Sequence, residues 1–257
     1  MKLLSIGNSF SQDAHRWLND VATANGIELY NVNLYIGGCS LETHHRLMNG
    51  DEAHYDNEIK AVPTGKISLK EALQNEKWDI ITFQQQSGAS GRAETYQPYL
   101  NELSNFVRSY QPSSKFYIHQ TWAYEPTFVF EAFKHYNNNY ELMHQKLTEC
   151  YLSAANSINA ELIPVGEVIN RLRTTTNEFS LKDNGVALTR DGFHLSLDYG
   201  RYAAALTWCV VLFGIDPLKD TFVPTIGDKK SDEALLNVVR KTVSEVVGDE
   251  RAYISKG

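Results

Sequence analysis

Five short apolar runs alternate along this chain with four longer amphipathic segments, and this order restricts the fold more than any other feature. The short runs are rich in β-branched and aromatic residues and end at turn residues, which is typical of strands. They cover Lys2–Ile6, Glu28–Tyr35, Asp79–Gln84, Lys115–Gln120 and Glu161–Val165. The longer segments carry apolar residues at helical spacing. They cover Gln12–Ala24, Glu94–Tyr110, Tyr140–Ile158 and Ser196–Phe213.

Strands that are separated by helices pair in parallel through crossover connections. We therefore expect an α/β protein, a three-layer α/β/α sandwich with about five parallel strands and the N-terminal strand at its centre. A length of 257 residues is enough for one sizeable core, and we assign residues 1–217 to that domain. Residues 218–257 are expected to form a C-terminal extension that packs on the same domain through one amphipathic helix, Asp232–Val247.

The composition argues against several classes of partner. The formal net charge is -7 and no run of Lys or Arg occurs, so neither a nucleic acid nor an anionic membrane would find a basic patch. The cysteines are three in number and form no CxxC pair, so we expect neither a disulfide framework nor a zinc knuckle. With no signal-peptide core and no apolar stretch of bilayer length, a cytoplasmic protein that acts on a neutral small molecule is expected.

The first candidate for chemistry is the serine that follows the N-terminal strand. In open parallel sheets, ligands bind at the carboxyl ends of the strands. The first strand ends in Gly7-Asn8-Ser9 directly before a helix. Ser9 then lies at a helix N-terminus, where free N–H groups and the helix dipole favour a developing negative charge. Serine is also common as a helix cap, and this alternative stays open for Ser9 or Ser11.

Two further strand ends carry hydrogen-bond donors. The second strand is followed by Gly37-Gly38, where a ligand can approach the backbone closely, unless the pair only forms a tight turn. The third strand runs into Gln84-Gln85-Gln86, and an amide donates N–H without a proton to lose. Because side chains alternate along a strand, Gln84 and Gln86 should share a direction. We favour Gln86 as the donor, with Gln84 beneath it as support.

The fourth candidate is a short segment before the last long helix, in which Asp191 and His194 are separated by a glycine turn. This spacing lets the carboxylate reach Nδ1 of the imidazole and leaves Nε2 to face another group. An imidazole oriented in this way activates a hydroxyl nucleophile. A metal site would need a further ligand, for which the obvious donors are His44, His45 and His119. We expect no metal and no other cofactor.

The order of these blocks resembles the SGNH (GDSL-type) hydrolase superfamily, whereas the Gly-x-Ser-x-Gly elbow of the α/β-hydrolases is absent. The stretches that carry the resemblance span roughly residues 2–213 and read IGNSFSQDA, WDIITFQQQSG, HQTWAY and RDGFHLSLDYGRYAAAL. They look like a little-characterised bacterial branch that is sometimes grouped with carbohydrate esterases. The resemblance implies a flavodoxin-like SGNH hydrolase fold.

The resemblance also implies a role for each block. Ser9 would be the nucleophile, and its N–H and that of Gly38, or less favourably Gly37, would bind the oxyanion. His194 would be the general base and Asp191 would orient it. The third block departs from the family pattern Gly-x-Asn-Asp, so an amide from Gln86 would replace the usual asparagine.

These roles predict a serine esterase that removes short acyl groups, acetyl above all, from a carbohydrate or another small molecule through an acyl-enzyme. The aromatic-rich region 121–139 is expected either to cap the core or to form a wall beside the site. In the second case Trp122 and Tyr124 would stack on a sugar ring, and His119 and Gln84 would also contact the substrate. A histidine at a strand end can equally be a structural residue.

Two other classes stay open. A binding module that keeps the scaffold without turnover would account for the unusual glutamines of the third block. A phosphate-handling protein could use the turn at Gly7–Ser11 as an anion cradle at a helix N-terminus, although the chain lacks a P-loop lysine.

Overall fold

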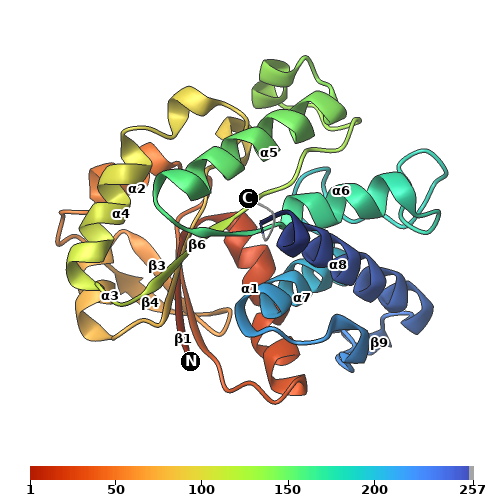
Figure 1. The fold of residues 1–257 in the computed structure, drawn as a ribbon, viewed down its shortest axis with the longest axis horizontal. Helices are drawn as coiled ribbons and strands as arrows, with labels where there is room; N and C mark the ends of the chain where they lie inside the picture. Colours follow the sequence, from red (N-terminus) through yellow and green to blue (C-terminus); the bar gives the residue numbers. More distant parts are fainter. Residues whose placement is uncertain (255–257) are drawn as a thin grey trace.

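A seven-stranded sheet forms the centre of the protein (Figure 1). The structure is a computed structural model that describes residues 1–254, with side chains to residue 249; residues 255–257 of the predicted extension lie outside the described residues. The strand order is β4-β3-β2-β1-β5-β6-β7. The strands are β1 (Lys2–Gly7), β2 (Tyr30–Tyr35), β3 (Tyr55–Ile59), β4 (Val62–Ile67), β5 (Ile80–Phe83), β6 (Lys115–His119) and β7 (Glu161–Ile163).

Five of these strands form a parallel array, and β1 is the central strand of the whole seven-stranded sheet. β1 pairs in parallel with β2 and β5, β5 with β6, and β6 with β7. Counted among the parallel strands alone, this is the flavodoxin-like order 2-1-3-4-5. The predicted α/β fold class and the central position of the N-terminal strand are confirmed.

An antiparallel hairpin of β3 and β4 extends the sheet beyond β2, and the sequence analysis missed it. All but the last residue of β4 are exposed, and the strand contains Pro63 and Gly65. An exposed edge strand of this kind has no buried face, so it carries no alternation of apolar and polar residues, and Pro is tolerated there. The sheet is therefore mixed and larger than the predicted array of about five parallel strands.

Helices cover both faces of the sheet (Figure 1). They are α1 (Ser9–Ala24), α2 (Leu41–Leu47), α3 (Leu69–Asn75), α4 (Tyr99–Tyr110), α5 (Tyr140–Ser157), α6 (Val165–Thr175), α7 (Tyr199–Phe213) and α8 (Glu233–Ile254). α1 packs against α7, and α6 and α8 pack against α7 in turn. α3, α4 and α5 lie on the other side of the sheet. A small hairpin of β8 (Thr225–Ile226) and β9 (Lys229–Lys230) precedes α8.

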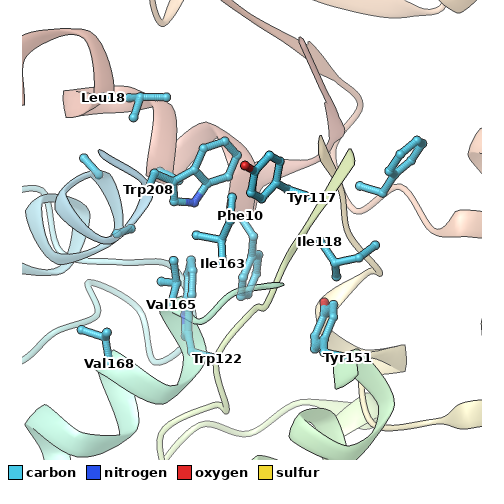
Figure 2. Close-up of a cluster of buried hydrophobic side chains, with 14 of the residues drawn as sticks. Phe10, Leu18, Tyr117, Ile118, Trp122, Tyr151, Ile163, Val165, Val168 and Trp208 are labelled. Carbon is cyan, nitrogen blue, oxygen red and sulfur yellow. The ribbon is translucent and has the colours of Figure 1, made fainter. Parts of the chain in front are cut away.

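Buried side chains hold the loops and helices at the carboxyl ends of the parallel strands in place. All four residues of β5 are buried, which is typical of a parallel strand that is covered on both faces. Figure 2 shows large side chains from α1, β6, α6 and α7 meeting in one cluster. Within it, the rings of Phe10 and Trp122 stack with centroids 4.3 Å apart. Phe10 follows Ser9 directly, so this contact holds the first turn of α1 against the segment that follows β6.

Across residues 1–254, no helix combines the length and the apolar character that crossing a bilayer requires.

Candidate active site

The start of α1 leaves the hydroxyl of Ser9 available. Asn8 is the N-cap residue, and its side-chain oxygen accepts a hydrogen bond from the backbone N–H of Phe10 at 3.0 Å. Ser11 Oγ in return accepts from the backbone N–H of Asn8 at 3.1 Å, which completes a capping box. The capping role therefore belongs to Asn8 together with Ser11, and the alternative that Ser9 caps the helix is wrong.

Buried amides hold Asn8 from both neighbouring strands. Its Nδ2 donates to the carbonyl of Cys39, after β2, at 2.9 Å. Nε2 of Gln84, after β5, donates to Oδ1 of Asn8 at 2.6 Å, and Oε1 of Gln84 accepts from Nδ1 of His119 at 2.9 Å. Burial, with a smaller contribution from His15, lowers the pKa of His119 to about 3. His119 is therefore neutral and donates to Gln84 as a fixed structural group.

A second relay reaches the helix start from the antiparallel hairpin. The carboxylate of Glu58 on β3 accepts from Nδ2 of Asn33 at 2.8 Å, and Oδ1 of Asn33 accepts from the hydroxyl of Ser11 at 2.7 Å. Glu58 is 2% exposed, and burial raises its pKa although Asn33 and Gln12 donate hydrogen bonds to it. Two independent chains of polar contacts thus fix the first turn of α1.

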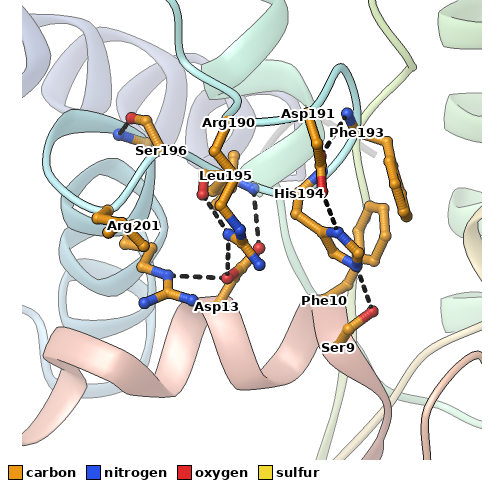
Figure 3. Close-up of polar contacts among 12 residues, drawn as sticks. Ser9, Phe10, Asp13, Arg190, Asp191, Phe193, His194, Leu195, Ser196 and Arg201 are labelled. Atoms are coloured by element: carbon orange, nitrogen blue, oxygen red, sulfur yellow. Dashed lines mark hydrogen bonds and ion pairs between the residues drawn. The ribbon is translucent and has the colours of Figure 1, made fainter. Parts of the chain in front are cut away.

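The structure brings Ser9, His194 and Asp191 into one hydrogen-bonded series (Figure 3). Nε2 of His194 lies 2.9 Å from Oγ of Ser9, and Nδ1 lies 2.7 Å from Oδ2 of Asp191. Oδ1 of Asp191 accepts the backbone N–H groups of Phe193 and His194 at 3.2 and 2.7 Å. Partial burial opposes ionisation of Asp191, but the hydrogen bonds from His194 and these backbone groups outweigh it and lower its pKa. This arrangement orients an imidazole toward a hydroxyl.

The loop that carries His194 is attached to other elements on both sides of this residue. Asp13, one turn after Ser9 on α1, accepts the backbone N–H of Leu195 at 2.8 Å (Figure 3). Nε1 of Trp122 donates to the carbonyl of Phe193 at 2.6 Å. The residues on either side of His194 are therefore each attached to a different part of the core.

A cavity of about 310 Å³ opens beside this series. Its walls come from the ends of β1, β2 and β5 and from the loops after β6 and α6. They consist of Asn8, Ser9, Phe10, Tyr35, Gly37, Gly38, Gln86, Ser87, Tyr124, Phe130, Phe193 and His194. Within the part of the chain that the structure describes, this lining contains no lysine or arginine, which disfavours the phosphate-handling alternative.

Three residues of this lining, Ser9, Gly38 and Gln86, carry hydrogen-bond donors. The N–H of Ser9 is at the first position of α1, where helix geometry leaves the backbone donors unpaired. Gly38 has a φ of +64°, a conformation that favours glycine, and its N–H meets no acceptor among residues 1–254. Oε1 of Gln86 accepts the N–H of Ala89 at 3.0 Å. The amide NH₂ of Gln86 is left without a protein acceptor among the described residues.

Three side chains predicted to bind substrate lie elsewhere, and this corrects the sequence analysis. Gln84, His119 and Trp122 are 2%, 0% and 0% exposed, and none of them lines the cavity. The first two support Asn8, and Trp122 supports the histidine loop. Tyr124 does line the cavity, with its hydroxyl 2.8 Å from Ser87 Oγ.

The aromatic-rich region 121–139 is mostly core. It is extended at first and then forms a short 3-10 helix, Glu131–Tyr136, and Phe133 and Tyr136 are fully buried. Phe130 differs, because it is 43% exposed and lines the cavity.

The described residues contain no group of three or more His, Cys, Asp and Glu side chains placed to hold a metal ion. His44, considered as a metal ligand, is fully buried beside Tyr55. The three cysteines are buried and unpaired. Burial raises the pKa of the Cys39 thiol, which follows Gly38, to about 12, so it is not a thiolate nucleophile.

Comparisons with known proteins place the chain in a family. The family described as a domain of unknown function, DUF4886, matches residues 2–242. The chain belongs to this family. A DUF4886 family protein from Bacteroides uniformis, known from its crystal structure, is 31% identical, with a TM-score of 0.86 over 96% of this chain and 94% of that one. No curated protein matches the sequence.

More distant solved structures share the fold of this DUF4886 protein. A putative SGNH hydrolase from Slackia heliotrinireducens is 22% identical, with a TM-score of 0.58 over 82% of this chain and 98% of that one. An acetyl xylan esterase, AlAXEase, is 14% identical, with a TM-score of 0.55 over 82% of this chain and 100% of that one. At these identities the likeness shows the fold alone, and it is the SGNH hydrolase fold.

Sequence reasoning missed two residues that build the site of this DUF4886 protein. Asn8 was read only as part of the Gly-Asn-Ser block, although Asn caps helices as readily as Ser. Asp13 was not singled out. Its signal was present in the sequence, because it lies four residues after Ser9 and therefore on the same side of the helix.

Proposed function

We propose that this protein is a serine esterase that releases short acyl groups from small-molecule or carbohydrate esters. The observation that carries the proposal is the hydrogen-bonded series of Ser9, His194 and Asp191 at the mouth of a cavity. A hydroxyl, a base within hydrogen-bond reach and a group that orients the base are the parts that nucleophilic catalysis needs. Structures of the same fold that are named as esterases support the same reaction class.

The reaction proceeds in two halves. Oγ of Ser9 attacks the ester carbonyl carbon while its proton passes to Nε2 of His194. The protonated His194, held by Asp191, then gives this proton to the leaving alcohol oxygen as the ester C–O bond breaks. In the second half His194 takes a proton from water as the water oxygen attacks the acyl carbonyl carbon. It then returns this proton to Oγ of Ser9 as the acyl C–Oγ bond breaks and the acid leaves.

The negative charge on the carbonyl oxygen has a binding place in this scheme. Ser9, Gly38 and Gln86 all line the cavity, and in this proposal the N–H groups of Ser9 and Gly38 and the amide of Gln86 bind the oxyanion. Donors aimed at the developing oxyanion provide a large share of the rate enhancement in acyl transfer. Gln86 serves here from a longer side chain than the asparagine of related enzymes, and its carbonyl oxygen is fixed by Ala89.

The cavity supports a small acyl group. A volume of about 310 Å³ is at the low end of the range for small-molecule sites, so a long acyl chain would extend into solvent. Phe193 packs against His194, with ring centroids 3.8 Å apart, and also lines the cavity. The half-exposed ring of Phe130 at this mouth provides a face on which a sugar ring can stack.

The decisive experiment is the Ser9→Ala variant, assayed with nitrophenyl esters from acetate upward and with acetylated sugars. We expect turnover of the acetate ester to fall by about 10⁴- to 10⁶-fold, and a serine-directed phosphonate to label the wild type on Ser9 alone. The matched control is Ser113→Ala, a serine at the opposite end of the sheet, which should behave like the wild type. Unchanged turnover in Ser9→Ala would refute the proposal. A wild type that binds acetylated sugars without turnover or labelling would instead indicate the binding-module alternative.

A further inference from the structure

The pairing of Asp191 with His194 is closed within its own loop. Asp191 accepts from the imidazole and from the backbone N–H groups of residues 193 and 194, and all of these donors lie within three residues. This unit keeps its internal geometry wherever the loop lies. Its position opposite Ser9 must therefore be set by contacts that the loop makes with other elements.

Asp13 makes the contacts that tie this loop to the helix of Ser9. Its carboxylate is fully buried. Oδ2 accepts the N–H of Leu195 at 2.8 Å, and Oδ1 accepts from Nη1 of Arg190 at 3.0 Å and from Nε of Arg201 at 2.8 Å. The two guanidinium groups compensate a carboxylate that would be costly to bury alone.

The placement of these donors has a geometric consequence. Arg190 and Leu195 stand on the two sides of the Asp191–His194 unit, and an antiparallel backbone bond from Arg190 N–H to the His194 carbonyl, at 2.9 Å, closes the loop between them. Asp13 therefore holds both ends of the loop. Because Asp13 and Ser9 are one helical turn apart, the distance between the hydroxyl and the imidazole is set through a single rigid turn of α1.

From this geometry we infer that Asp13 is a positioning residue, which holds His194 at hydrogen-bonding distance from Ser9 without touching the substrate. The inference rests on the proposed esterase function for its catalytic meaning. Trp122 at the Phe193 carbonyl and the N–H of Glu125 at the Gly192 carbonyl contribute further attachments, but both belong to the segment after β6 and share no element with Ser9.

The Asp13→Asn variant isolates this role. Asparagine has the same shape, but one acceptor oxygen becomes an NH₂ group, which must then face either the N–H of Leu195 or the two guanidinium groups. The NH₂ group of asparagine and the N–H group that faces it cannot form a hydrogen bond, so the loop is displaced. A misplacement of about 1 Å lowers turnover by up to about 100-fold, so we expect kcat to fall by about 10- to 100-fold. KM should stay within about threefold, because the walls of the cavity are retained.

Two companion variants separate positioning from general stability. Asp20→Asn changes the same residue type on the same helix at an exposed position and should leave kcat unchanged. Arg190→Gln removes the guanidinium from the loop and leaves the carboxylate with its Leu195 contact, so it should lower kcat by a smaller factor than Asp13→Asn. If Asp13→Asn does not fold, Arg190→Gln decides the question, and a wild-type kcat in that variant overturns the inference.

A measurement independent of turnover uses the ¹⁵N resonance of His194 Nε2. In the wild-type background, Ser9→Ala removes the hydrogen bond to Nε2 and should shift this resonance. In the Asp13→Asn background the same substitution should have little effect, because the hydrogen bond is already lost. An equal shift in both backgrounds overturns the inference. An inactive wild type that nevertheless shows the difference would refute the esterase proposal and leave the positioning role of Asp13 supported.

Discussion

The two ends of the parallel sheet present cavities of opposite character. At the carboxyl ends, a cavity of about 310 Å³ is lined by Ser9, His194, Gly38 and Gln86. The N–H of Gly38 and the NH₂ of Gln86 meet no protein acceptor among the described residues. At the amino ends, a groove of about 920 Å³ is lined by residues at the starts of β1, β5 and β6, among them Met1, Ile80 and Lys115. The groove is three times larger, yet its lining includes no histidine and no cysteine. Chemistry, rather than size, distinguishes the candidate site.

The difference follows from the direction of the chain. Each strand of a parallel array runs toward the same edge, and the loop that leaves it there must turn into a helix. Helix starts leave backbone N–H groups unpaired, so the carboxyl edge gathers donors such as the N–H of Ser9. At the amino edge the chain enters the strands from helix ends, where carbonyl groups are unpaired instead.

Among the tests of the difference between the two ends of the sheet, the largest loss of activity is expected at His194. His194→Ala removes the base and should lower kcat for acetate esters by about 10⁴- to 10⁶-fold, with the melting temperature within a few degrees of the wild type. Single-turnover and steady-state assays on the purified variant check this. If the variant kept more than about one per cent of the wild-type activity, the imidazole of His194 would not be the base that distinguishes the carboxyl end of the sheet.

The next effect concerns the third block of the sequence. Gln86→Glu keeps the oxygen that accepts the N–H of Ala89 but replaces the donating NH₂ with an acceptor that faces the oxyanion. We expect kcat to fall by about 10²- to 10³-fold without a change in fold. Gln74→Glu, an exposed position on α3, is the matched control. Equal activity in Gln86→Glu and the wild type would remove this amide from the oxyanion site.

The pH dependence of stability provides a smaller effect. Partial burial opposes ionisation of Asp191, but hydrogen bonds from His194 and the backbone hold its pKa below the usual 3.8. A carboxyl group with a depressed pKa stabilises the folded state above the unfolded pKa, and this contribution is lost as the pH falls through the folded pKa. Because Asp191 is 40% exposed, Asp191→Asn should melt only roughly 1–3 °C below the wild type at neutral pH.

Thermal melts between pH 7 and pH 3 check this prediction, since the difference in melting temperature should begin to narrow as the pH falls below about 3.8. Asp20 provides a control of opposite sign: its side chain is exposed, but partial desolvation by its neighbours, opposed by Arg16, raises its pKa. Asp20→Asn should not lower the melting temperature at neutral pH. A gap between Asp191→Asn and the wild type that persists at low pH would show that the difference does not arise from ionisation.

The smallest effect is expected in the groove at the amino ends. Lys115→Ala removes an exposed side chain from its lining and should change kcat/KM for acetate esters by less than about twofold. A kinetic assay under the same conditions as for His194→Ala checks this. A large loss of activity would mean that the two ends of the sheet are coupled and that the carboxyl end does not determine turnover alone.

The contacts of the candidate site could be predicted from the sequence where they depend on close spacing along the chain or on the order of the strands. The spacing of Asp191 and His194 predicts their contact, because three residues and a glycine turn determine it. The meeting of Ser9 with His194 follows from the common edge at which parallel strands end. The structure agrees with both predicted contacts, while the catalytic roles of these residues stay predictions.

Other features depend on contacts that local patterns do not encode. The alternation argument for the glutamines failed for Gln84, because β5 ends at Phe83 and Gln84 already turns into the core toward Asn8. The cap could not be assigned, since Asn and Ser have similar capping preferences. The cluster of Asp13 with Arg190 and Arg201 joins residues that are more than 170 positions apart, and no periodicity reports such a contact.

The relay from Glu58 through Asn33 to Ser11 has an implication for sequence comparison. The four sequence blocks that carry the family resemblance do not include the β3–β4 hairpin. Yet the carboxylate of Glu58 on this hairpin accepts a hydrogen bond from the amide of Asn33, which in turn accepts one from the hydroxyl of Ser11. A change in the length or charge of this hairpin would therefore reach the first turn of α1 while every residue of the four blocks stays the same. The surroundings of Ser9 thus depend on a strand at the rim of the sheet that a comparison of the four blocks alone would leave out.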